Sequence, residues 1–296
     1  MKILNLVYPE KSDIKYKISK FPDGQNQLTI LDKTLLNEYI EIKTRINNFI
    51  DLEILICAVK SLKGLNVRGI NLYSPYILGS RSDRKFEEGS NNYLKDVICP
   101  ILNSLNFYSI TCLDPHSDVL EACIKSNFLR ISNEEVVKFA LSEIYDYDSN
   151  EGNSRMVLIS PDAGASKKIY KVAESFEFEG DIIICSKERD KDGKLTKCVV
   201  PLSNLGNKDL IIIDDICDGG ATFINIAKEI KDHYIGNSCP KIYLIVTHGI
   251  FSKGYEELSK YFDGIYCTNS YNDIPKYNEY DGISIGSKIL KQLNIF

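Results

Sequence analysis

The chain has 296 residues, of which 44% are hydrophobic and 26% charged, and its formal net charge is −5. These are the proportions of an ordinary globular protein, and the length allows one large or two medium domains. The negative charge argues against nucleic acid or an anionic membrane surface as the main partner. The nine cysteines are scattered, with Cys57, Cys112 and Cys185 inside apolar runs, which indicates free thiols. Since neither a signal sequence nor a transmembrane run is visible, we expect a cytoplasmic protein.

Short apolar runs alternate along the chain with longer segments of helical period. The runs predict strands at residues 3–8, 27–30, 70–73, 109–113, 157–159, 182–185, 210–213 and 242–246. The helical segments are 49–62, 91–105, 134–144, 165–174 and 223–233. This alternation is typical of βαβ units, so the sequence predicts an α/β fold with mainly parallel sheets flanked by helices. The polar, turn-rich segment 146–154 is the weakest-patterned join, and we expect two domains, residues 1–148 and 149–296.

An arginine-rich cluster, residues 74–85, follows the predicted strand at 70–73. Arg81 and Arg84, with Asp83 between them, lie on a post-strand loop, and guanidinium groups bind polyphosphates through paired hydrogen bonds. The alternative is a charged loop that simply faces solvent. The cluster therefore makes this loop a candidate polyphosphate site.

Three further polar clusters stand out. Asp23 and Gln25 belong to a Pro-Asp-Gly segment that alone would be an ordinary turn. His116 lies between two aspartates directly after the strand at 109–113, where ligands of open α/β sheets collect, so it is a candidate for a metal or nucleotide role. A structural histidine is the alternative. Asp162, in a Ser-Pro-Asp sequence, follows the strand at 157–159 in the same way.

A strongly polar excursion follows the predicted strand at 182–185. Lys187 and Arg189 are two residues apart, so in an extended chain their side chains point the same way. Such a pair could stabilise the charge that develops during phosphoryl transfer. The competing interpretation is a hairpin that turns at Asp192-Gly193, and both interpretations can hold at once.

The most informative stretch is residues 210–222. Its apolar start predicts a strand buried on both faces, and Asp214 and Asp215 appear where we expect that strand to leave the sheet. A turn containing glycines then opens a predicted helix and offers backbone N–H groups to a phosphate. Carboxylates there would repel a phosphate unless they face sugar hydroxyls or a cation. The stretch therefore predicts a phosphorylated sugar as ligand, against the alternative of a capped helix and a solvated acid pair. The predicted sugar-phosphate residues are Asp214, Asp215, Asp218, Gly219, Gly220, Ala221 and Thr222.

Taken together and in this order, the clusters resemble the ribose-phosphate diphosphokinases. The 214–222 stretch is similar to that family's ribose-phosphate loop, and residues 81–84 are similar to its ATP-contacting arginine motif. Residues 21–25 resemble the segment that reaches the nucleotide of a neighbouring subunit. The remaining matches are Asp114-Pro115-His116, Ser160-Pro161-Asp162, Lys187-Glu188-Arg189 and Thr247–Phe251.

The resemblance implies two phosphoribosyltransferase-type domains, with the last residues packing back on the first, and homo-oligomers such as dimers or hexamers. It implies ATP binding by Arg81, Asp83, Arg84, Asp23 and Gln25, catalytic Lys187, Arg189 and His116, and magnesium at His116 and Asp162. The implied reaction moves the β,γ-diphosphate of Mg-ATP to ribose 5-phosphate in nucleotide biosynthesis. No membrane partner is implied. A phosphoribosyltransferase or a catalytically silent regulatory homologue is the alternative.

Four positions depart from the family pattern. Gln25 replaces a glutamate, Ser82 a glutamine and Pro115 a leucine, and Gly219 stands where relatives have threonine. Losing that threonine leaves room for a substituted phosphate. Phage-type relatives use ADP-ribose in NAD salvage, so ADP-ribose is the alternative acceptor.

Overall fold

A computed structural model describes residues 1–145, 155–189, 195–201, 207–234, 239–274 and 290–296. The join that we expected at 146–154 lies outside these residues. Contacts divide the chain into two units, one made of residues 1–132 with Phe296 and the other of residues 133–295. The domain boundary at 148 stays a prediction. None of the described helices is long and apolar enough to cross a membrane.

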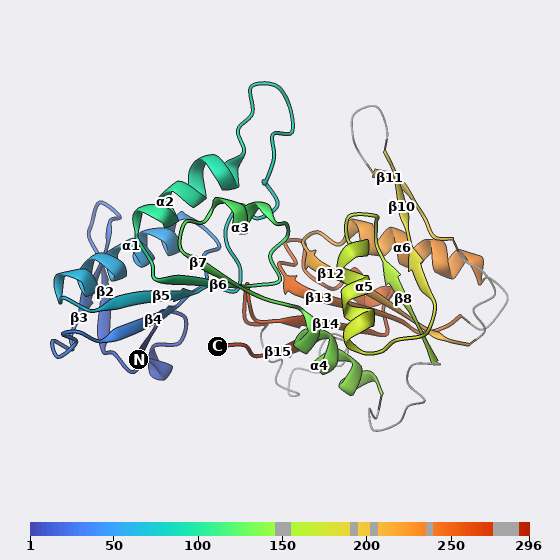
Figure 1. The fold of residues 1–296 in the computed structure, drawn as a ribbon. Helices are drawn as coiled ribbons and strands as arrows, with labels where there is room; N and C mark the ends of the chain where they lie inside the picture. Colours follow the sequence, from blue (N-terminus) through green and yellow to red (C-terminus); the bar gives the residue numbers. More distant parts are fainter. Residues whose placement is uncertain (146–154, 190–194, 202–206, 235–238, 275–289) are drawn as a thin grey trace. The chain divides into compact units, whose positions relative to one another are not determined.

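The first unit is built on a five-stranded parallel sheet with the strand order β1-β4-β5-β6-β7 (Figure 1). Its strands are β1 (Lys2–Asn5), β4 (Tyr39–Lys43), β5 (Gly69–Tyr73), β6 (Ser109–Leu113) and β7 (Asn127–Ile131), and a separate antiparallel hairpin pairs β2 (Tyr16–Lys20) with β3 (Asn26–Ile30). Its helical segments are η1 (Pro9–Lys11), α1 (Phe49–Gly64), the π-helical turn η2 (Leu94–Ile98), α2 (Cys99–Ser104) and α3 (Val119–Cys123).

Helix α1 forms at the position that the sequence predicts, and its cap and its buried side chains explain why. The Asn48 side chain accepts hydrogen bonds from the N–H groups of Ile50 and Asp51, which satisfies donors that an uncapped helix leaves unpaired. The buried side chains Leu52, Leu55, Val59 and Leu62 recur at helical spacing. They pack into the core beneath the sheet.

The second unit is a six-stranded sheet with the order β15-β14-β13-β12-β8-β9, in which every pair is parallel. Its strands are β8 (Met156–Ser160), β9 (Ile182–Ile184), β12 (Asp209–Cys217), β13 (Ile242–Gly249), β14 (Gly264–Thr268) and β15 (Leu290–Leu293). The helices are α4 (Glu134–Ile144), α5 (Ser166–Ser175), α6 (Ala221–His233) and the short η4 (Leu258–Lys260), and a hairpin pairs β10 (Ser186–Arg189) with β11 (Leu195–Val199).

Strand β12 is buried on both faces, as its unbroken apolar run predicts. Ile211 and Ile213 pack in one cluster with α4 and α5, whereas Leu210 and Ile212 pack in another with α6. The two helical layers therefore enclose the sheet, and the predicted α/β class with mainly parallel sheets is confirmed.

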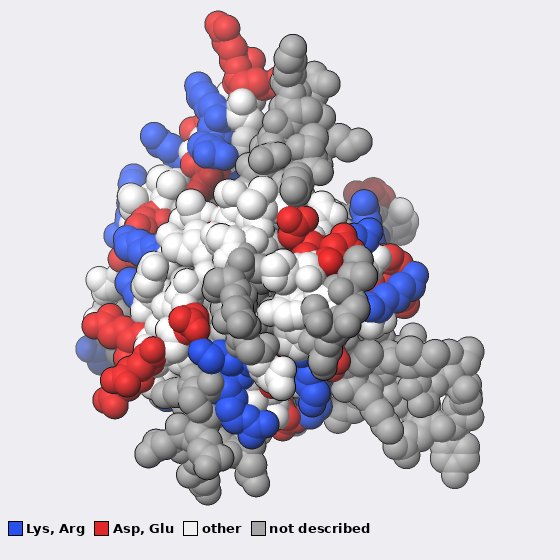
Figure 2. Space-filling model, turned by 90° about the vertical axis from the view of Figure 1, so that its right-hand side faces the viewer, with Lys and Arg blue, Asp and Glu red and all other residues white. Residues whose placement is uncertain are grey.

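The free state of the cysteines is also confirmed, since all nine of them lie in the described residues and none is in a disulfide. On the face drawn in Figure 2, basic and acidic side chains are interspersed over the described residues.

Candidate active site

The acid pair lies within a strand, not after one. We predicted that the strand would end at residue 213, but β12 continues to Cys217 and pairs with β13 as far as Gly249. On its other side β12 pairs with β8 only through Ile212. Asp214 and Asp215 therefore occupy the part of β12 that extends beyond the pairing with β8. The continuing ladder with β13 explains why two carboxylates did not terminate the strand.

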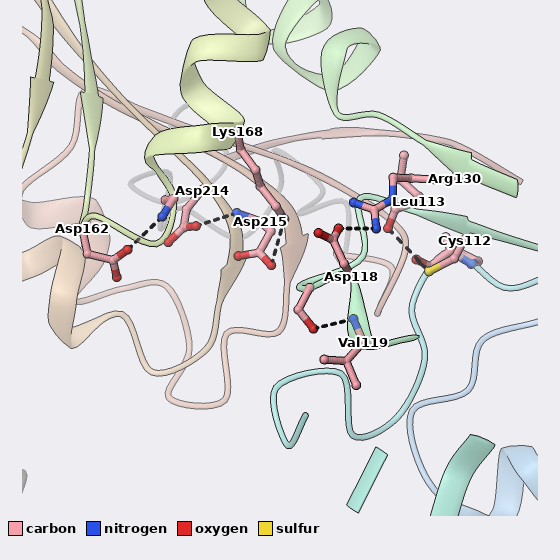
Figure 3. A network of polar contacts seen from close by, with 12 residues as sticks. Cys112, Leu113, Asp118, Val119, Arg130, Asp162, Lys168, Asp214 and Asp215 are labelled. Carbon is pink, nitrogen blue, oxygen red and sulfur yellow. Dashed lines mark hydrogen bonds and ion pairs between the residues drawn. The ribbon is translucent and has the colours of Figure 1, made fainter. Parts of the chain in front are cut away.

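Asp215 is the more enclosed of the two acids, with only 4% of the residue exposed. Its carboxylate Oδ2 lies 3.2 Å from Nζ of Lys168 on α5, and its backbone N–H donates to Oδ1 of Asp214 over 2.9 Å (Figure 3). The lysine supplies a counter-charge that a buried carboxylate requires. The two acids are thus tied to each other and to α5.

Asp214 is half-buried, and its carboxyl group lies close to other negative charges. Withdrawal from water raises its pKa well above the ordinary range, and the charges of Asp215 and then Asp162 raise it further. A pKa displaced in this way by burial and neighbouring charges is a common mark of a functional site. Sugar hydroxyls or a divalent cation would relieve the repulsion.

Asp162 lies in the turn after β8, beside Asp214 (Figure 3). Its Oδ1 accepts a hydrogen bond from the N–H of Ala165 at 3.0 Å, and the hydroxyl of Ser160 donates to its carbonyl oxygen. These bonds fix the entry into α5. Among the residues that the structure describes, no three His, Cys, Asp or Glu side chains form a metal cluster. Magnesium is usually held by one or two carboxylates plus substrate phosphates and water, so Asp162 and Asp214 fit such a site.

The predicted phosphate loop joins β12 to α6. Gly220 has φ +76°, and an added Cβ there would lie 3.0 Å from the Leu258 side chain, so both conformation and space require glycine. No side chain caps the helix at Gly220, and α6 begins at Ala221. The first N–H groups of α6 can therefore bind an anion.

Gly219 differs from Gly220 because its backbone does not exclude a side chain. A Cβ at Gly219 would lie 3.4–3.7 Å from the Cδ, Cε and Cγ atoms of Lys253, which is ordinary contact distance. The direction in which a threonine would point is thus filled by an aliphatic stem. We expected the missing threonine to leave room beside the phosphate site, and the Lys253 side chain lies along one side of that room.

In the first unit, the arginine loop is anchored at Gly79. This residue has φ +81°, and an added Cβ would lie 2.6 Å from the Tyr93 ring. The side-chain amide of Asn92 donates to the carbonyl oxygen of Asp83. Arg81 and Arg84 are exposed on the loop. The backbone is fixed here, while the guanidinium groups reach solvent.

His116 is exposed, and its two flanking aspartates differ. Asp114 is buried with φ 40°, an uncommon value for a residue other than glycine. Asp118 forms an ion pair with Arg130 over 2.8 Å. Of the two carboxylates that flank His116 in the sequence, Asp118 is therefore paired with an arginine.

Comparison with known proteins finds relatives of this chain. The phosphoribosyl transferase domain model matches residues 127–272. The ribose-phosphate pyrophosphokinase of Mycoplasmopsis pulmonis is 28% identical over 244 residues, covering 81% of this chain and 70% of that protein. The ribose-phosphate pyrophosphokinase of Sulfurisphaera tokodaii is 26% identical over 252 residues, covering 83% and 80%. These relatives confirm the predicted assignment of the chain as similar to the ribose-phosphate diphosphokinases.

The fold of the whole chain agrees with this assignment. The crystal structure of phosphoribosylpyrophosphate synthetase from Mycobacterium smegmatis covers 97% of this chain and 88% of its own, with a TM-score of 0.76 at 16% identity. At that identity the likeness shows a shared fold. The predicted family and its transferase class are confirmed.

The Lys187-Glu188-Arg189 motif lies on β10 of the β10–β11 hairpin. Lys187 pairs with Cys198 and Glu188 with Lys197, in antiparallel register, with an irregularity before Arg189. The hairpin interpretation is therefore confirmed, while its expected tip at Asp192-Gly193 lies outside the described residues. The roles of Lys187 and Arg189 stay predictions.

Asp23 and Gln25 occupy the exposed tip of the β2–β3 hairpin. The N–H of Gln25 donates to Oδ1 of Asp23 over 3.2 Å, as in an Asx turn. The segment is therefore the turn that its sequence predicts. Its nucleotide role in a neighbouring subunit stays a prediction.

Sequence reasoning missed Lys168 and Lys253. A signal for Lys168 was present, because it lies four residues before the buried Val172 and so shares the sheet-facing side of α5. No comparable signal marks Lys253, which reaches Gly219 from a loop after β13.

Proposed function

We propose that the chain transfers the β,γ-diphosphate of ATP to the anomeric hydroxyl of ribose 5-phosphate, giving 5-phosphoribosyl 1-diphosphate and AMP. The observation that carries this proposal is that one element, β12 with its turn into α6, holds both an acid pair and an uncapped helix start. Carboxylates accept hydrogen bonds from ribose hydroxyls, and the helix start offers N–H groups to the 5-phosphate. A phosphorylated sugar needs both.

Each side chain has a role in this proposal. Asp214 and Asp215 orient the ribose so that its anomeric oxygen can form a bond to the β-phosphorus of ATP. The bond from that phosphorus to the oxygen of the α-phosphate breaks, and AMP leaves with the electron pair. The proton of the anomeric hydroxyl passes to solvent. Arg81 and Arg84 bind the ATP phosphates through paired hydrogen bonds.

Catalysis then depends on charge at the transferring group. Lys187 and Arg189 stabilise the negative charge that develops on the transferring diphosphate, and His116 is the third catalytic residue. Asp162 and Asp214, which lie close together after β8 and on β12, would hold magnesium. The metal role of His116 stays a prediction. When bound, magnesium neutralises phosphate charge and orients the diphosphate.

ADP-ribose is the second candidate acceptor. Gly219 carries no side chain beside the phosphate site, and its neighbour there is the flexible stem of Lys253. An acceptor with a substituted phosphate meets less steric resistance at glycine than at threonine. The same transfer to that acceptor gives ADP-ribose 1-diphosphate and AMP.

The test offers the full chain ATP and magnesium with ribose 5-phosphate, with ADP-ribose, or with no acceptor, and follows AMP release. We expect release only when an acceptor is present. Release that does not depend on either acceptor would contradict the proposal. A phosphoribosyltransferase would instead consume 5-phosphoribosyl 1-diphosphate without ATP, which the same assay distinguishes.

A further inference from the structure

The contact between Lys168 and Asp215 joins a helix to the acid pair. The side chain of Asp215 is 5% exposed and that of Lys168 is 25% exposed, so their 3.2 Å ion pair is largely withdrawn from water. A carboxylate in that environment is unfavourable unless a positive group stays beside it. Lys168 therefore constrains how this carboxylate can lie.

The contact extends beyond one acid. Nζ of Lys168 lies beside Oδ2 of Asp215. The backbone N–H of Asp215 in turn donates to Oδ1 of Asp214. Figure 3 shows the three residues as a continuous chain that starts on α5. Holding Asp215 in place also fixes the donor that orients Asp214. A single lysine thus affects the side chains of both acids in the proposed ribose site.

Packing alone does not require a charge at this position. The neighbouring buried residues of α5 are apolar, Ile169, Val172 and Ala173, and they already attach the helix to the sheet. A methionine would supply the same stem as lysine with less desolvation of charge. The ammonium group therefore calls for an explanation through its partner, Asp215.

We propose that Lys168 is a positioning residue for the sugar acceptor. It holds the carboxylate of Asp215 so that the acid pair offers acceptor atoms to two neighbouring ribose hydroxyls in one fixed geometry. Lys168 acts through Asp215 and forms no bond to the reacting atoms. The inference rests on the proposed function, because it takes the acceptor to be a sugar phosphate bound at this strand.

The test measures acceptor binding separately from turnover. Calorimetry gives the Kd of ribose 5-phosphate and of ADP-ribose for full-length Lys168→Met, Lys168→Arg and Lys171→Met, the last being an exposed lysine on the same helix. Lys168→Met should weaken acceptor binding about tenfold or more, as expected when a charge-assisted hydrogen bond is lost from a buried site. Lys168→Arg should recover most of the affinity, and Lys171→Met should bind as the wild type does. The Kd of ATP should not change in any variant.

A double-mutant cycle separates positioning from a general loss of structure. In the Asp215→Asn background, Lys168→Met should change the acceptor Kd little, because its partner charge is already gone. Equal weakening in both backgrounds would overturn the proposal, as would wild-type affinity in Lys168→Met or a wild-type chain that binds neither acceptor. A wild-type chain that binds an acceptor but releases no AMP would instead refute the proposed reaction and leave the role of Lys168 standing.

Discussion

The backbone N–H of Asp215 donates to the carboxylate of Asp214, and the buried charge of Asp215 lies beside the acid that it helps to orient. Withdrawal from water raises the pKa of Asp214 well above its ordinary value, and the neighbouring charge of Asp215 raises it further. Because the pKa is higher in the folded than in the unfolded chain, ionisation of Asp214 opposes folding. The contribution of Asp214 to stability is therefore fully present below the unfolded pKa of about 3.9 and is lost as pH rises through the folded pKa.

Asp214→Asn should relieve this opposition. The variant should unfold at a higher temperature than the wild type at pH 8, by about 2–4 °C for each kcal/mol relieved. The difference should shrink as pH falls, because Asp214 is then neutral in both states. Thermal unfolding with a chelator present measures it, and Asp232→Asn, an exposed acid on α6, is the control. A difference that is the same at every pH would contradict the assigned cause.

The sequence predicted the elements whose patterns are local. Residues 109–113 and 134–144 form the strand and the helix with the boundaries that we expected. Strand β7 was missed because it is largely exposed, and β4 because charged residues interrupt its apolar pattern. The predicted helix at 91–105 begins later, in the π-helical turn at Leu94, which a period of 3.6 does not predict.

The site was predictable as a set of motifs but not as contacts. The acid pair and the glycine turn follow from sequence order, whereas the Lys168–Asp215 ion pair depends on how α5 packs against β12. The position of Lys253 over Gly219 likewise comes from a loop 34 residues farther along the chain. Long-range packing of this kind leaves no local period to detect.

The hairpin lysine should matter in the transition state. Lys187→Ala should lower kcat about 10²–10³-fold, the usual effect of removing one group that stabilises developing charge. The KM for ATP should change little, because the contact forms mainly during transfer. Lys197→Ala, on the opposite strand β11, is the matched control. A rise in KM with kcat unchanged would contradict the assignment.

Asp162 should determine the magnesium requirement. Asp162→Asn keeps an oxygen that can accept from Ala165, so the turn into α5 should survive. The variant should need roughly tenfold or more magnesium for half-maximal rate, by analogy with other altered metal environments. A magnesium titration of AMP release measures this, and a chelator should abolish activity in both proteins. Wild-type magnesium dependence in the variant would remove Asp162 from the metal site.

Gly219 should control the choice of acceptor. A threonine there must displace the stem of Lys253, so Gly219→Thr should lower kcat/KM for ADP-ribose more than for ribose 5-phosphate. Gly219→Ala is the control, since its Cβ would make only ordinary contacts at 3.4 Å. Equal slowing of both acceptors, or a wild type that ignores ADP-ribose, would make Gly219 a turn residue only.

The most direct measurement of the central claim follows the β-phosphorus of ATP. The full chain is given ATP labelled at that phosphorus, with magnesium and ribose 5-phosphate or ADP-ribose, and the products are separated. We predict that the label moves to the sugar in an amount equal to the AMP formed. Label recovered in ADP, or left in ATP while an acceptor is present, would contradict diphosphate transfer.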